Sequence, residues 1–412
     1  MDFLDLDRTC PLNFDVLIAG AGPAGSASAI HLARQGFRVL AVDRAAFPRD
    51  KACSEYLGPE AVRQLDGLGV LADLEAAGAS LLTGTTVIAA GGARLAGTFA
   101  AAGHAPFRAT GLAVSRRLLD ARLLQAAREA GATVLERTSI EQLLFDRGAV
   151  AGAVLRDADG HTRVARARLT VGADGLRSIV ARRIGRRRHG APSRIAFVAH
   201  LAGVEGMTTQ AEMHVSEQGY VGLNHLGGGV TNVALVVPQR SVAAARGRAT
   251  GFFLDSLRRF PGVRDRIAGR AIIRAVLVTG PFAAWSGRVV TDGAVLVGDA
   301  ADFFDPFTGE GIYSALKGAE LLASAVPAAL ADGGPVTAAR LSAYLRARRR
   351  AFAGKWAVER MIGYGMLMPA LFDRAVERLG RRGLADTLIG VTADFVPASA
   401  VLNPRFLARM VL

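Results

Sequence analysis

The sequence contains little cysteine, little lysine and no long uninterrupted apolar run. Cys10 and Cys53 are the only cysteines among 412 residues, which excludes a disulfide framework and favours a reducing compartment. No apolar stretch reaches about 18 residues without a charge or a helix breaker, so no transmembrane segment is predicted. The N-terminus lacks the basic-then-apolar pattern of a signal peptide. We therefore expect a cytoplasmic protein.

The chain is strongly basic, with a formal net charge of +14. Such a charge favours nucleic-acid or anionic-surface binding, but all basic residues except three lysines are arginines scattered along an Ala- and Gly-rich chain. We therefore predict no nucleic-acid partner. The densest cluster, Arg182–Arg188, is interpreted as a solvated loop, with a patch for an anionic partner as the alternative. Weak contact between the apolar C-terminal helices and a membrane surface stays open, although core packing is the preferred use.

The stretch FDVLIAGAGPAGSASAIHLARQGFRVLAVDR predicts a strand over 15–19, a glycine-rich turn, a helix over 24–35 and a strand over 38–42. In such a turn the first glycine allows the sharp bend, the second lets a pyrophosphate approach the backbone, and the third lets helix and strand pack closely. An acid that closes the second strand can accept from an adenosine ribose. The residues predicted to contact a dinucleotide here are Gly20, Gly22, Pro23, Ala24, Gly25, Asp43 and Arg44.

Two further nucleotide-type elements follow far along the chain. The stretch GADG (172–175) comes after a predicted strand over 167–171, and GDAADFFDPFTGEGI (298–312) comes after a predicted strand over 294–297. Asp174 can also be read as a helix cap. Elements so far apart can meet on one long ligand only if the chain leaves the first domain and returns twice. FAD is long enough to require this, so FAD is the predicted bound cofactor.

The third element is predicted to hold the flavin end of the cofactor. Asp299 is expected to accept from the ribityl hydroxyls, while the glycines keep the backbone clear of side chains next to the ring. The residues predicted to contact the cofactor in this element are Gly298, Asp299, Pro306, Gly309, Glu310, Gly311 and Ile312. No metal site is predicted.

In their order and separation, the three motifs resemble the flavoprotein superfamily of para-hydroxybenzoate-hydroxylase-like monooxygenases, flavin halogenases and geranylgeranyl reductases, over roughly residues 14–340. DPFTGEGI, FPRDKACSE (47–55) and VSRRLLD (114–120) are most similar to the geranylgeranyl reductase branch. The resemblance implies that Arg116 contacts FAD and that Lys51 is a phosphate or carboxylate contact near the cofactor. It leaves Cys53 as a packing residue beside the flavin.

The same resemblance implies an α/β fold in which a Rossmann-type FAD-binding domain is interleaved with a mixed β-sheet substrate domain and followed by C-terminal helices. The FAD-binding domain is predicted over 1–77, 111–189 and 283–340, the substrate domain over 78–110 and 190–282, and the helical region over 341–412. A hairpin is predicted at Gly227–Gly229.

Near this hairpin the chain departs from the reductases. Where they typically have a Tyr-Gly-Trp-x-Phe-Pro motif, this chain has Tyr220-Val221-Gly222-Leu223-Asn224-His225. We expect a more open cavity with two added polar groups, so Asn224 and His225 are the candidate catalytic residues. A structural role for His225 is the alternative.

These features predict an FAD-dependent oxidoreductase that acts on an apolar or aromatic small molecule. No second nucleotide-binding unit is present, so NAD(P)H is expected as a transient electron donor, or a flavin or electron-transfer partner supplies the electrons. Monooxygenation is the preferred reaction, and reduction of a C=C bond in an isoprenoid or polyketide is the alternative. Halogenation ranks lower because the halogenase Trp-x-Trp-x-Ile-Pro motif is absent. The alternative that is not an enzyme is a basic nucleic-acid or membrane-surface binding module that only inherited the fold.

Overall fold

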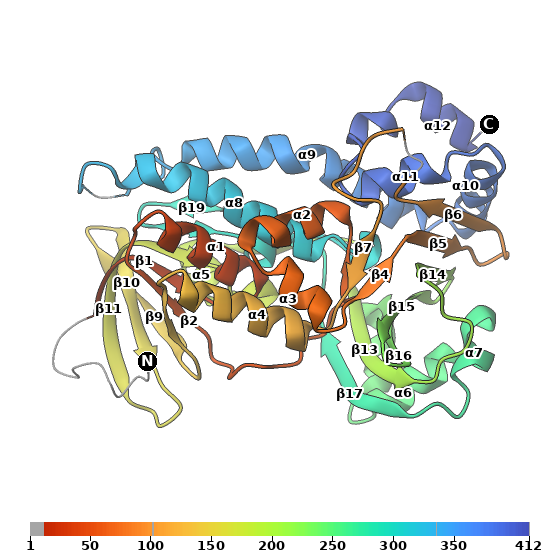
Figure 1. Ribbon diagram of the computed structural model, residues 1–412, viewed down its shortest axis with the longest axis horizontal. Helices are drawn as coiled ribbons and strands as arrows, with labels where there is room; N and C mark the ends of the chain where they lie inside the picture. The colour runs from red at the N-terminus through yellow and green to blue at the C-terminus, as the bar shows by residue number, and fades with distance from the viewer. Residues whose placement is uncertain (1–11, 101–102, 335, 412) are drawn as a thin grey trace.

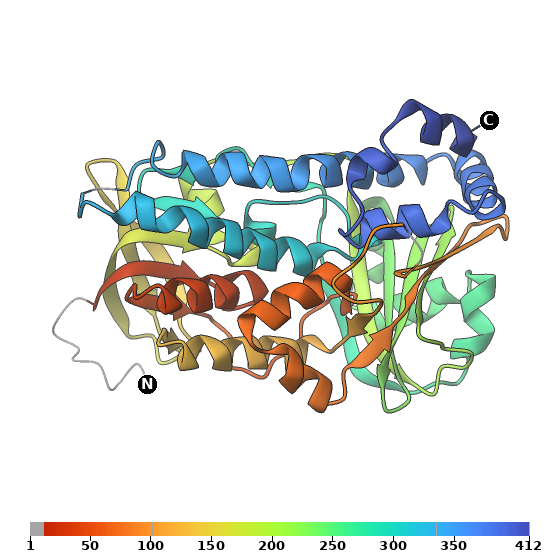
Figure 2. The same ribbon diagram turned by 45° about the horizontal axis from the view of Figure 1, so that its top comes forward.

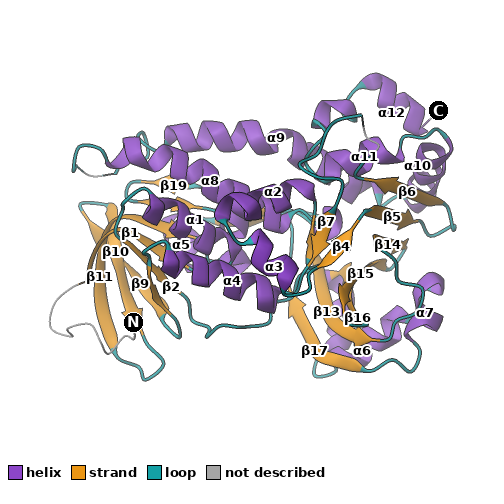
Figure 3. Ribbon diagram, viewed as in Figure 1, coloured by secondary structure: helices purple, strands orange, loops and turns teal. Residues whose placement is uncertain are grey.

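The computed structural model describes residues 12–100, 103–334 and 336–411. Two large β-sheets lie at opposite ends of an elongated molecule, and helices run between and above them (Figures 1 and 2). Figure 3 shows that the helices gather over one side of the left-hand sheet and at the upper right, beyond the right-hand sheet. Cys10 lies outside the described residues.

The first sheet has eight strands and is centred on β1 (Leu12–Ala19). Strands β20, β11, β1, β2 and β8 run parallel to one another. The end of β1 is fully buried, as expected for a parallel strand that is covered on both faces. The other strands of this sheet are β2 (Val39–Val42), β8 (Thr133–Leu135), β9 (Ser139–Asp146), β10 (Ala149–Arg156), β11 (Thr162–Gly172), β19 (Val290–Thr291) and β20 (Ala294–Leu296).

Helices cover one face of this sheet, and the antiparallel strands β9 and β10 with helix α5 (Ile179–Ile184) pack on the other. The helices of the first face share a core of alanine, leucine, isoleucine and valine side chains. They are α1 (Pro23–Arg34), α2 (Pro59–Leu68), α3 (Leu71–Ala76), α4 (Arg116–Glu129) and α8 (Gly311–Leu330).

The second large sheet has seven strands in the order β17-β13-β16-β15-β14-β5-β6. Helices α6 (Ala249–Leu257) and α7 (Pro261–Ile267) cover one face, and the opposite face packs against the C-terminal helices and the 303–307 segment. Its strands are β5 (Gly84–Ile88), β6 (Arg94–Thr98), β13 (Arg194–Ala202), β14 (Gln210–Ser216), β15 (Gly219–Gly227), β16 (Val230–Pro238) and β17 (Ile272–Thr279).

Two three-stranded sheets complete the strand pairing of the described chain. One contains β3 (Tyr56–Leu57), β7 (Gly111–Ala113) and β4 (Ser80–Leu82), and the other contains β12 (Arg187–His189), β18 (Ala284–Ser286) and β21 (Asp302–Phe303).

The described part of the C-terminal region contains four α-helices, of which the longest, α9, lies along the outer edge of the molecule in both views (Figures 1 and 2). Among the described helices, none combines the length and the hydropathy that a membrane crossing requires. The four are α9 (Ser342–Gly365), α10 (Pro369–Arg381), α11 (Ala385–Thr392) and α12 (Pro404–Val411).

The structure confirms the predicted α/β class and the strand, turn and helix order of the first motif. The hairpin at Gly227–Gly229 is also confirmed, because β15 and β16 pair on either side of it. The predicted domain boundaries stay a prediction.

Candidate functional site

The glycine-rich turn between β1 and α1 is packed so closely that two of its glycines admit no side chain. A Cβ on Gly20, whose φ is +90°, would lie 2.7 Å from the Ala173 carbonyl oxygen. A Cβ on Gly25 would lie 1.8 Å from the Gly20 carbonyl oxygen. Helix α1 then begins at Pro23 with no side chain capping it, so its first N–H groups are free to bind an anion.

Asp43 at the end of β2 is tied to this turn. One of its carboxylate oxygens accepts from Ala21 N at 2.8 Å, and the other accepts from Ala45 N at 2.9 Å. Arg44, its neighbour, is solvent-exposed. The carboxylate predicted to hold a ribose therefore lies directly beside the predicted phosphate turn.

Two guanidinium groups face the middle glycine of the turn. A Cβ on Gly22 would lie 3.4 Å from Arg49 Nη2 and 3.8 Å from Arg116 Nη2. The buried carboxylate of Asp120 holds both, pairing with Arg116 at 2.7 Å and with Arg49 at 3.0 Å. Burial lowers the pKa of the Lys51 ammonium, and the charges of Arg49 and Arg116 lower it further. Lys51 therefore lies close to both guanidinium groups. Sequence reasoning found Arg116 and Lys51 but missed Arg49.

The second motif packs against the first. The position of a Gly20 Cβ lies 2.8 Å from Asp174 Cα. Asp174 Oδ2 accepts from Ile179 N at 2.6 Å, while its Oδ1 is buried without a hydrogen-bond partner among the described residues. Burial raises the pKa of this carboxyl. Both readings of Asp174 thus have support, because one oxygen binds the next helix and the other is free for a ligand.

The third motif meets the first two at Gly298. This residue has a φ of +61°, and a Cβ on it would lie 3.1 Å from Ala24 Cβ of α1. Burial raises the pKa of Asp299 to about 6, against the opposing effects of Lys51, Arg116 and Arg187. The three distant segments therefore converge on one region, as the sequence predicts.

Arg187, one member of the arginine cluster, has a structural role. Its guanidinium donates to the Asp299 and Ala300 carbonyl oxygens at 2.9 and 2.8 Å, so it holds the 298–300 turn in place. The other arginines of the cluster, Arg182, Arg183, Arg186 and Arg188, are exposed. The interpretation as a solvated loop applies to those four and not to Arg187.

In the turn between β21 and α8, aromatic side chains account for both glycines. A Cβ on Gly309, whose φ is +74°, would lie 2.6 Å from Tyr56 Cδ1, and one on Gly311 would lie 3.1 Å from Phe303 Cε2. The prediction that these glycines exist to clear a ring face is therefore too simple, because the packing of the chain itself already demands them. Pro306 and Ile312 belong to the same turn and the start of α8.

Asp305 joins this turn to the second sheet, and sequence reasoning did not assign it a role. Its Oδ1 accepts from the Tyr220 hydroxyl at 2.6 Å and from Phe307 N at 3.0 Å. Its Oδ2 pairs with Arg194 at 2.6 Å. All three side chains, Asp305, Tyr220 and Arg194, are buried, so the position of the turn depends on strands β13 and β15.

Glu310, predicted to contact the cofactor, forms an ion pair with Lys355 of α9. Lys355 also pairs with Asp394 at 3.3 Å. Burial raises the pKa of Asp394 to about 6 and that of Glu359 to about 7, with Lys355 opposing both shifts. One oxygen of the Glu310 carboxylate is therefore engaged by the C-terminal helices.

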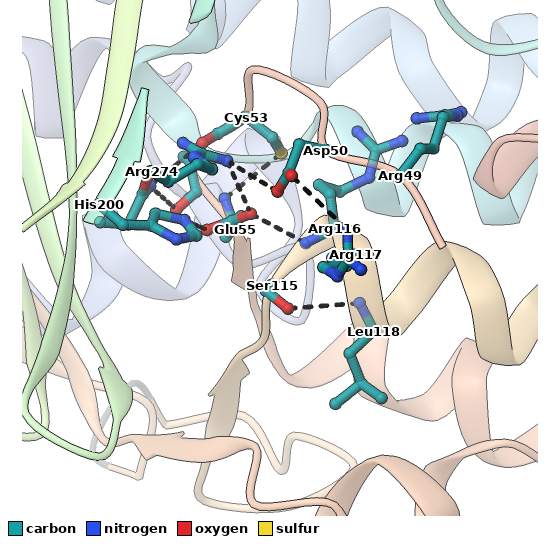
Figure 4. Close-up of polar contacts among 12 residues, drawn as sticks. Arg49, Asp50, Cys53, Glu55, Ser115, Arg116, Arg117, Leu118, His200 and Arg274 are labelled. Carbon is teal, nitrogen blue, oxygen red and sulfur yellow. Dashed lines mark hydrogen bonds and ion pairs between the residues drawn. The ribbon is translucent and has the colours of Figure 1, made fainter. Parts of the chain in front are cut away.

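Glu55 links the region of the phosphate turn to the second sheet, and we call its contacts with Arg116, His200 and Arg274 the Glu55 clasp (Figure 4). The sequence motifs did not point to this residue. It is fully buried with a φ of +57°. Its Oε1 accepts from Arg116 N at 2.8 Å, its Oε2 contacts His200 Nε2 at 2.6 Å, and Arg274 lies 3.5 Å away. His200 and Arg274 belong to the second sheet, so the segment next to the phosphate turn is fixed to that sheet.

Cys53 is placed within the same clasp. Burial raises the pKa of its thiol, and its carbonyl oxygen accepts from Asn232 Nδ2 at 3.1 Å. A thiol with a raised pKa stays protonated and is a poor nucleophile, which agrees with the predicted packing role.

Strand alternation separates the two candidate catalytic residues. Tyr220 and Asn224 lie on the face of β15 that is directed toward Asp305, because successive side chains of a strand alternate and the Tyr220 hydroxyl binds Asp305. His225 lies on the opposite face, where its Nδ1 accepts from Gly227 N at 3.2 Å. The two candidate residues therefore lie on opposite faces of β15, which supports the structural alternative for His225. Asn224 is buried, and its Nδ2 has no hydrogen-bond partner among the described residues.

Comparison with known proteins fits this geometry. Residues 13–251 match the profile of the FAD binding domain family. The menaquinone reductase of Mycolicibacterium smegmatis is 36% identical over 326 residues, covering 75% of each chain. The chain belongs to the FAD-binding domain family. It is an FAD-dependent oxidoreductase of the superfamily that includes geranylgeranyl reductases and flavin halogenases.

Two further comparisons extend the likeness to about nine tenths of the chain. Digeranylgeranylglycerophospholipid reductase 2 of Methanothermobacter thermautotrophicus is 31% identical over 90% of this chain and 91% of its own. The solved structure of the myxobacterial chondrochloren halogenase matches with a TM-score of 0.80 at 25% identity, covering 86% of this chain and 83% of its own.

The residues of the site suit FAD. The free N–H groups of α1 and the cations Arg49, Lys51 and Arg116 form a cradle for a pyrophosphate, and the Asp174 carboxylate retains an unpaired oxygen. When bound, FAD supplies the redox chemistry, and NAD(P)H is the typical electron donor of this family.

Proposed function

We propose that this flavoprotein reduces a carbon–carbon double bond in the isoprenoid chain of a lipid such as a quinone. The observation that carries the proposal is the 36% identity, over three quarters of the chain, to an enzyme named menaquinone reductase. An enzyme named for an isoprenoid phospholipid matches over nine tenths of the chain.

The side chains between the sheet and the flavin turn support an apolar substrate. On the sheet face directed toward Asp305, the core contains Val198, Met213 and Ala234, together with Phe303 and Phe307 from the turn. Asp305 shares this region, but its charge is compensated by Arg194. A hydrocarbon chain bound there would therefore contact apolar side chains, and the charge of Asp305 would not oppose it because Arg194 neutralises that charge.

We propose specific roles for the residues at the cofactor. Gly20, Gly22, Gly25 and the start of α1 bind the pyrophosphate, with Arg49, Lys51 and Arg116 compensating its charge. Asp43 holds the adenosine ribose and Asp299 the ribityl chain. Tyr220 and Arg194 bind Asp305 and so hold the 306–311 turn beside the flavin ring. The contacts of Glu55 with Arg116 and His200 close the site to water where it meets the second sheet.

Monooxygenation is the second candidate, and Gly222 favours it. Among the described residues, only Met213 would approach a Cβ at this position, at 3.2 Å. With no large side chain at position 222, only the flexible Met213 side chain has to move aside for a ring system there. Lys51 lies with Arg49, Arg116 and Asp299, beside the phosphate turn, which gives halogenation no added support.

Isotope labelling separates the two reactions. The holoprotein is supplied with NADPH and a menaquinone, once without oxygen and once under ¹⁸O₂, and products are analysed by mass spectrometry. Reduction of the isoprenoid chain in the absence of oxygen yields a product that stays two hydrogens heavier after its quinone ring is reoxidised in air, and it incorporates no label. Incorporation of ¹⁸O, with no turnover under anaerobic conditions, would contradict the proposal and favour monooxygenation.

A further inference from the structure

Helix α9 has one buried face and one face that no other part of the described chain covers. On the inner face, Tyr344, Arg348, Phe352 and Lys355 are buried. On the outer face, residues at spacings of three or four form an exposed or half-buried row, which we call the α9 stripe. It consists of Leu345, Arg349, Ala353, Trp356, Ala357, Arg360 and Tyr364.

The stripe leads into a cluster of exposed apolar side chains where α9 ends and α10 begins. Leu367 is 57% exposed, Met368 52% and Leu371 37%, and we call these three residues the apolar corner. A shallow groove follows the stripe from Leu345 to Arg360. Adjoining apolar side chains exposed in this way mark an interaction surface rather than scattered exceptions.

Positive charge accompanies this apolar surface. Residues 341–412 contain twelve arginines and lysines against five acidic residues. Arg349 and Arg350 are exposed, and neither has an ion-pair partner among the described residues. Apolar and aromatic side chains flanked by free arginines are typical of a helix that lies in the interface of an anionic membrane, because arginine stems extend along apolar surface while their charges reach the lipid phosphates.

The stripe also has an ordered aromatic anchor and a direct connection to the flavin turn. The guanidinium of Arg348 lies 5.1 Å from the centre of the Trp356 ring, which fixes the indole at the groove. The Phe304 ring lies 5.9 Å from the Tyr364 ring, and Arg360 lies over Phe304 at 5.3 Å. The exposed surface is thus one residue layer away from the turn that contacts the cofactor.

We propose that the α9 stripe and the apolar corner dock this protein on the surface of an anionic lipid bilayer. The leucine, methionine, tryptophan and tyrosine side chains enter the headgroup region, and the arginines bind lipid phosphates. This attachment is peripheral, and it places the flavin turn toward the bilayer. The inference concerns a surface and goes beyond the proposed reaction, so it does not depend on which substrate is reduced.

Vesicle sedimentation of the FAD-loaded protein tests this inference without any substrate. We expect the protein to bind phosphatidylcholine vesicles that contain phosphatidylglycerol and to bind pure phosphatidylcholine vesicles far more weakly. The Leu367→Gln/Met368→Gln variant is expected to bind about tenfold more weakly, because it removes apolar side chains from the interface. The Arg349→Gln/Arg350→Gln variant is expected to lose about fivefold in affinity per arginine, and only at low salt.

Phe145→Gln is the matched control, because Phe145 is 55% exposed but lies on β9 of the first sheet. It is expected to bind vesicles like the unaltered protein, and flavin absorbance verifies the folding of every variant. The inference is overturned if the corner variant and Phe145→Gln bind equally well. It is also overturned if the corner variant instead dissociates a dimer, or if duplex DNA and not the vesicles retains the protein.

Discussion

At the scale of single residues, Asp299 is the carboxylate on which the proposed cofactor site depends most. Asp299→Ala removes the proposed acceptor for the ribityl chain, and a hydrogen bond to a charged group contributes about 1.5–3 kcal/mol. We therefore expect FAD affinity to fall by at least about tenfold, measured by flavin fluorescence titration of the apoprotein.

Asp146→Ala is the control for this substitution, because Asp146 is an exposed carboxylate on β9. Its FAD affinity is expected to be unchanged. Full flavin occupancy in Asp299→Ala would contradict the proposed role of the third motif.

Glu55 allows a sharper test of the clasp. Glu55→Ala leaves the buried His200 without its carboxylate partner and Arg274 with only the more distant Asp50, and such losses cost about 3 kcal/mol or more. Glu55→Gln keeps the length of the side chain and one oxygen acceptor but loses the charge, so it is expected to cost less than Glu55→Ala. Urea unfolding followed by circular dichroism measures both variants, and unaltered stability in both would contradict the proposed role of Glu55 in joining the two sheets.

Single residues also show where sequence reasoning stops. Arg116 and Asp299 stand within recognisable motifs, so the sequence is enough to propose them. Glu55 and Asp305 contact partners more than a hundred residues away, His200 and Arg194 respectively. No local pattern encodes such a pairing, since the chain topology must be known first.

At the scale of elements, the turn before α8 is the most constrained segment of the site. Gly309→Ala forces a side chain into the left-handed region, which costs about 1–2 kcal/mol, and against the Tyr56 ring. We expect a lower melting temperature together with weaker FAD binding.

Gly36→Ala is the matched control for the turn. Gly36 also has a positive φ, of +86°, but a Cβ there would meet nothing within 4 Å. Gly36→Ala is expected to lose stability only through the cost of the left-handed backbone conformation and to keep its FAD affinity. Equal FAD affinities in the two variants would refute the idea that the turn positions the cofactor.

The acidic group around Lys355 predicts a pH dependence. Burial raises the pKa of Asp394 to about 6 and that of Glu359 to about 7. The folded protein therefore holds protons that the unfolded chain releases nearer pH 4, so this contribution to stability is present at low pH and is lost as pH rises through about 6 to 7.

Lys355→Met should sharpen this loss, because the ammonium opposes both pKa shifts. We expect its melting temperature to fall further below that of the unaltered protein at pH 8 than at pH 5, and Glu359→Gln in the same background to restore part of the difference. A gap that is independent of pH would show that Lys355 acts through packing alone.

Regular elements were easier to predict than short ones. The strand and helix of the first motif were placed within a few residues, because a buried apolar strand, a glycine turn and an amphipathic helix each follow local rules. The alternation that places Asn224 and His225 on opposite faces was available from the strand pattern. The short strands β12, β18 and β21 were not predicted, since pairings of only two or three residues carry almost no local signal.

At the scale of the whole molecule, the C-terminal helices are part of the site. Arg348 pairs with Asp302 at 2.7 Å, Lys355 pairs with Glu310, and Arg194 donates to the Gly363 carbonyl oxygen. A chain that ends at residue 340 loses all three contacts. We expect it to be insoluble or free of FAD, as measured by flavin absorbance after purification, and full FAD content would contradict this coupling.

The global organisation was predicted only as far as the resemblance reached. The order of the three motifs indicated that the chain leaves the first sheet and returns. The resemblance also implied that 78–110 joins 190–282 in one sheet, but it did not specify the parallel pairing of β14 with β5 within that sheet.

The interleaved connectivity has a consequence for biosynthesis. The phosphate turn at Gly20–Gly25 emerges early from the ribosome, whereas Asp299 and the Lys355 that holds Glu310 are translated much later. Strands β5 and β6 likewise wait for β14 before they join a sheet. The proposed cofactor pocket therefore cannot be complete until the segment around Lys355 has left the ribosome, and flavin loading is expected only after that point.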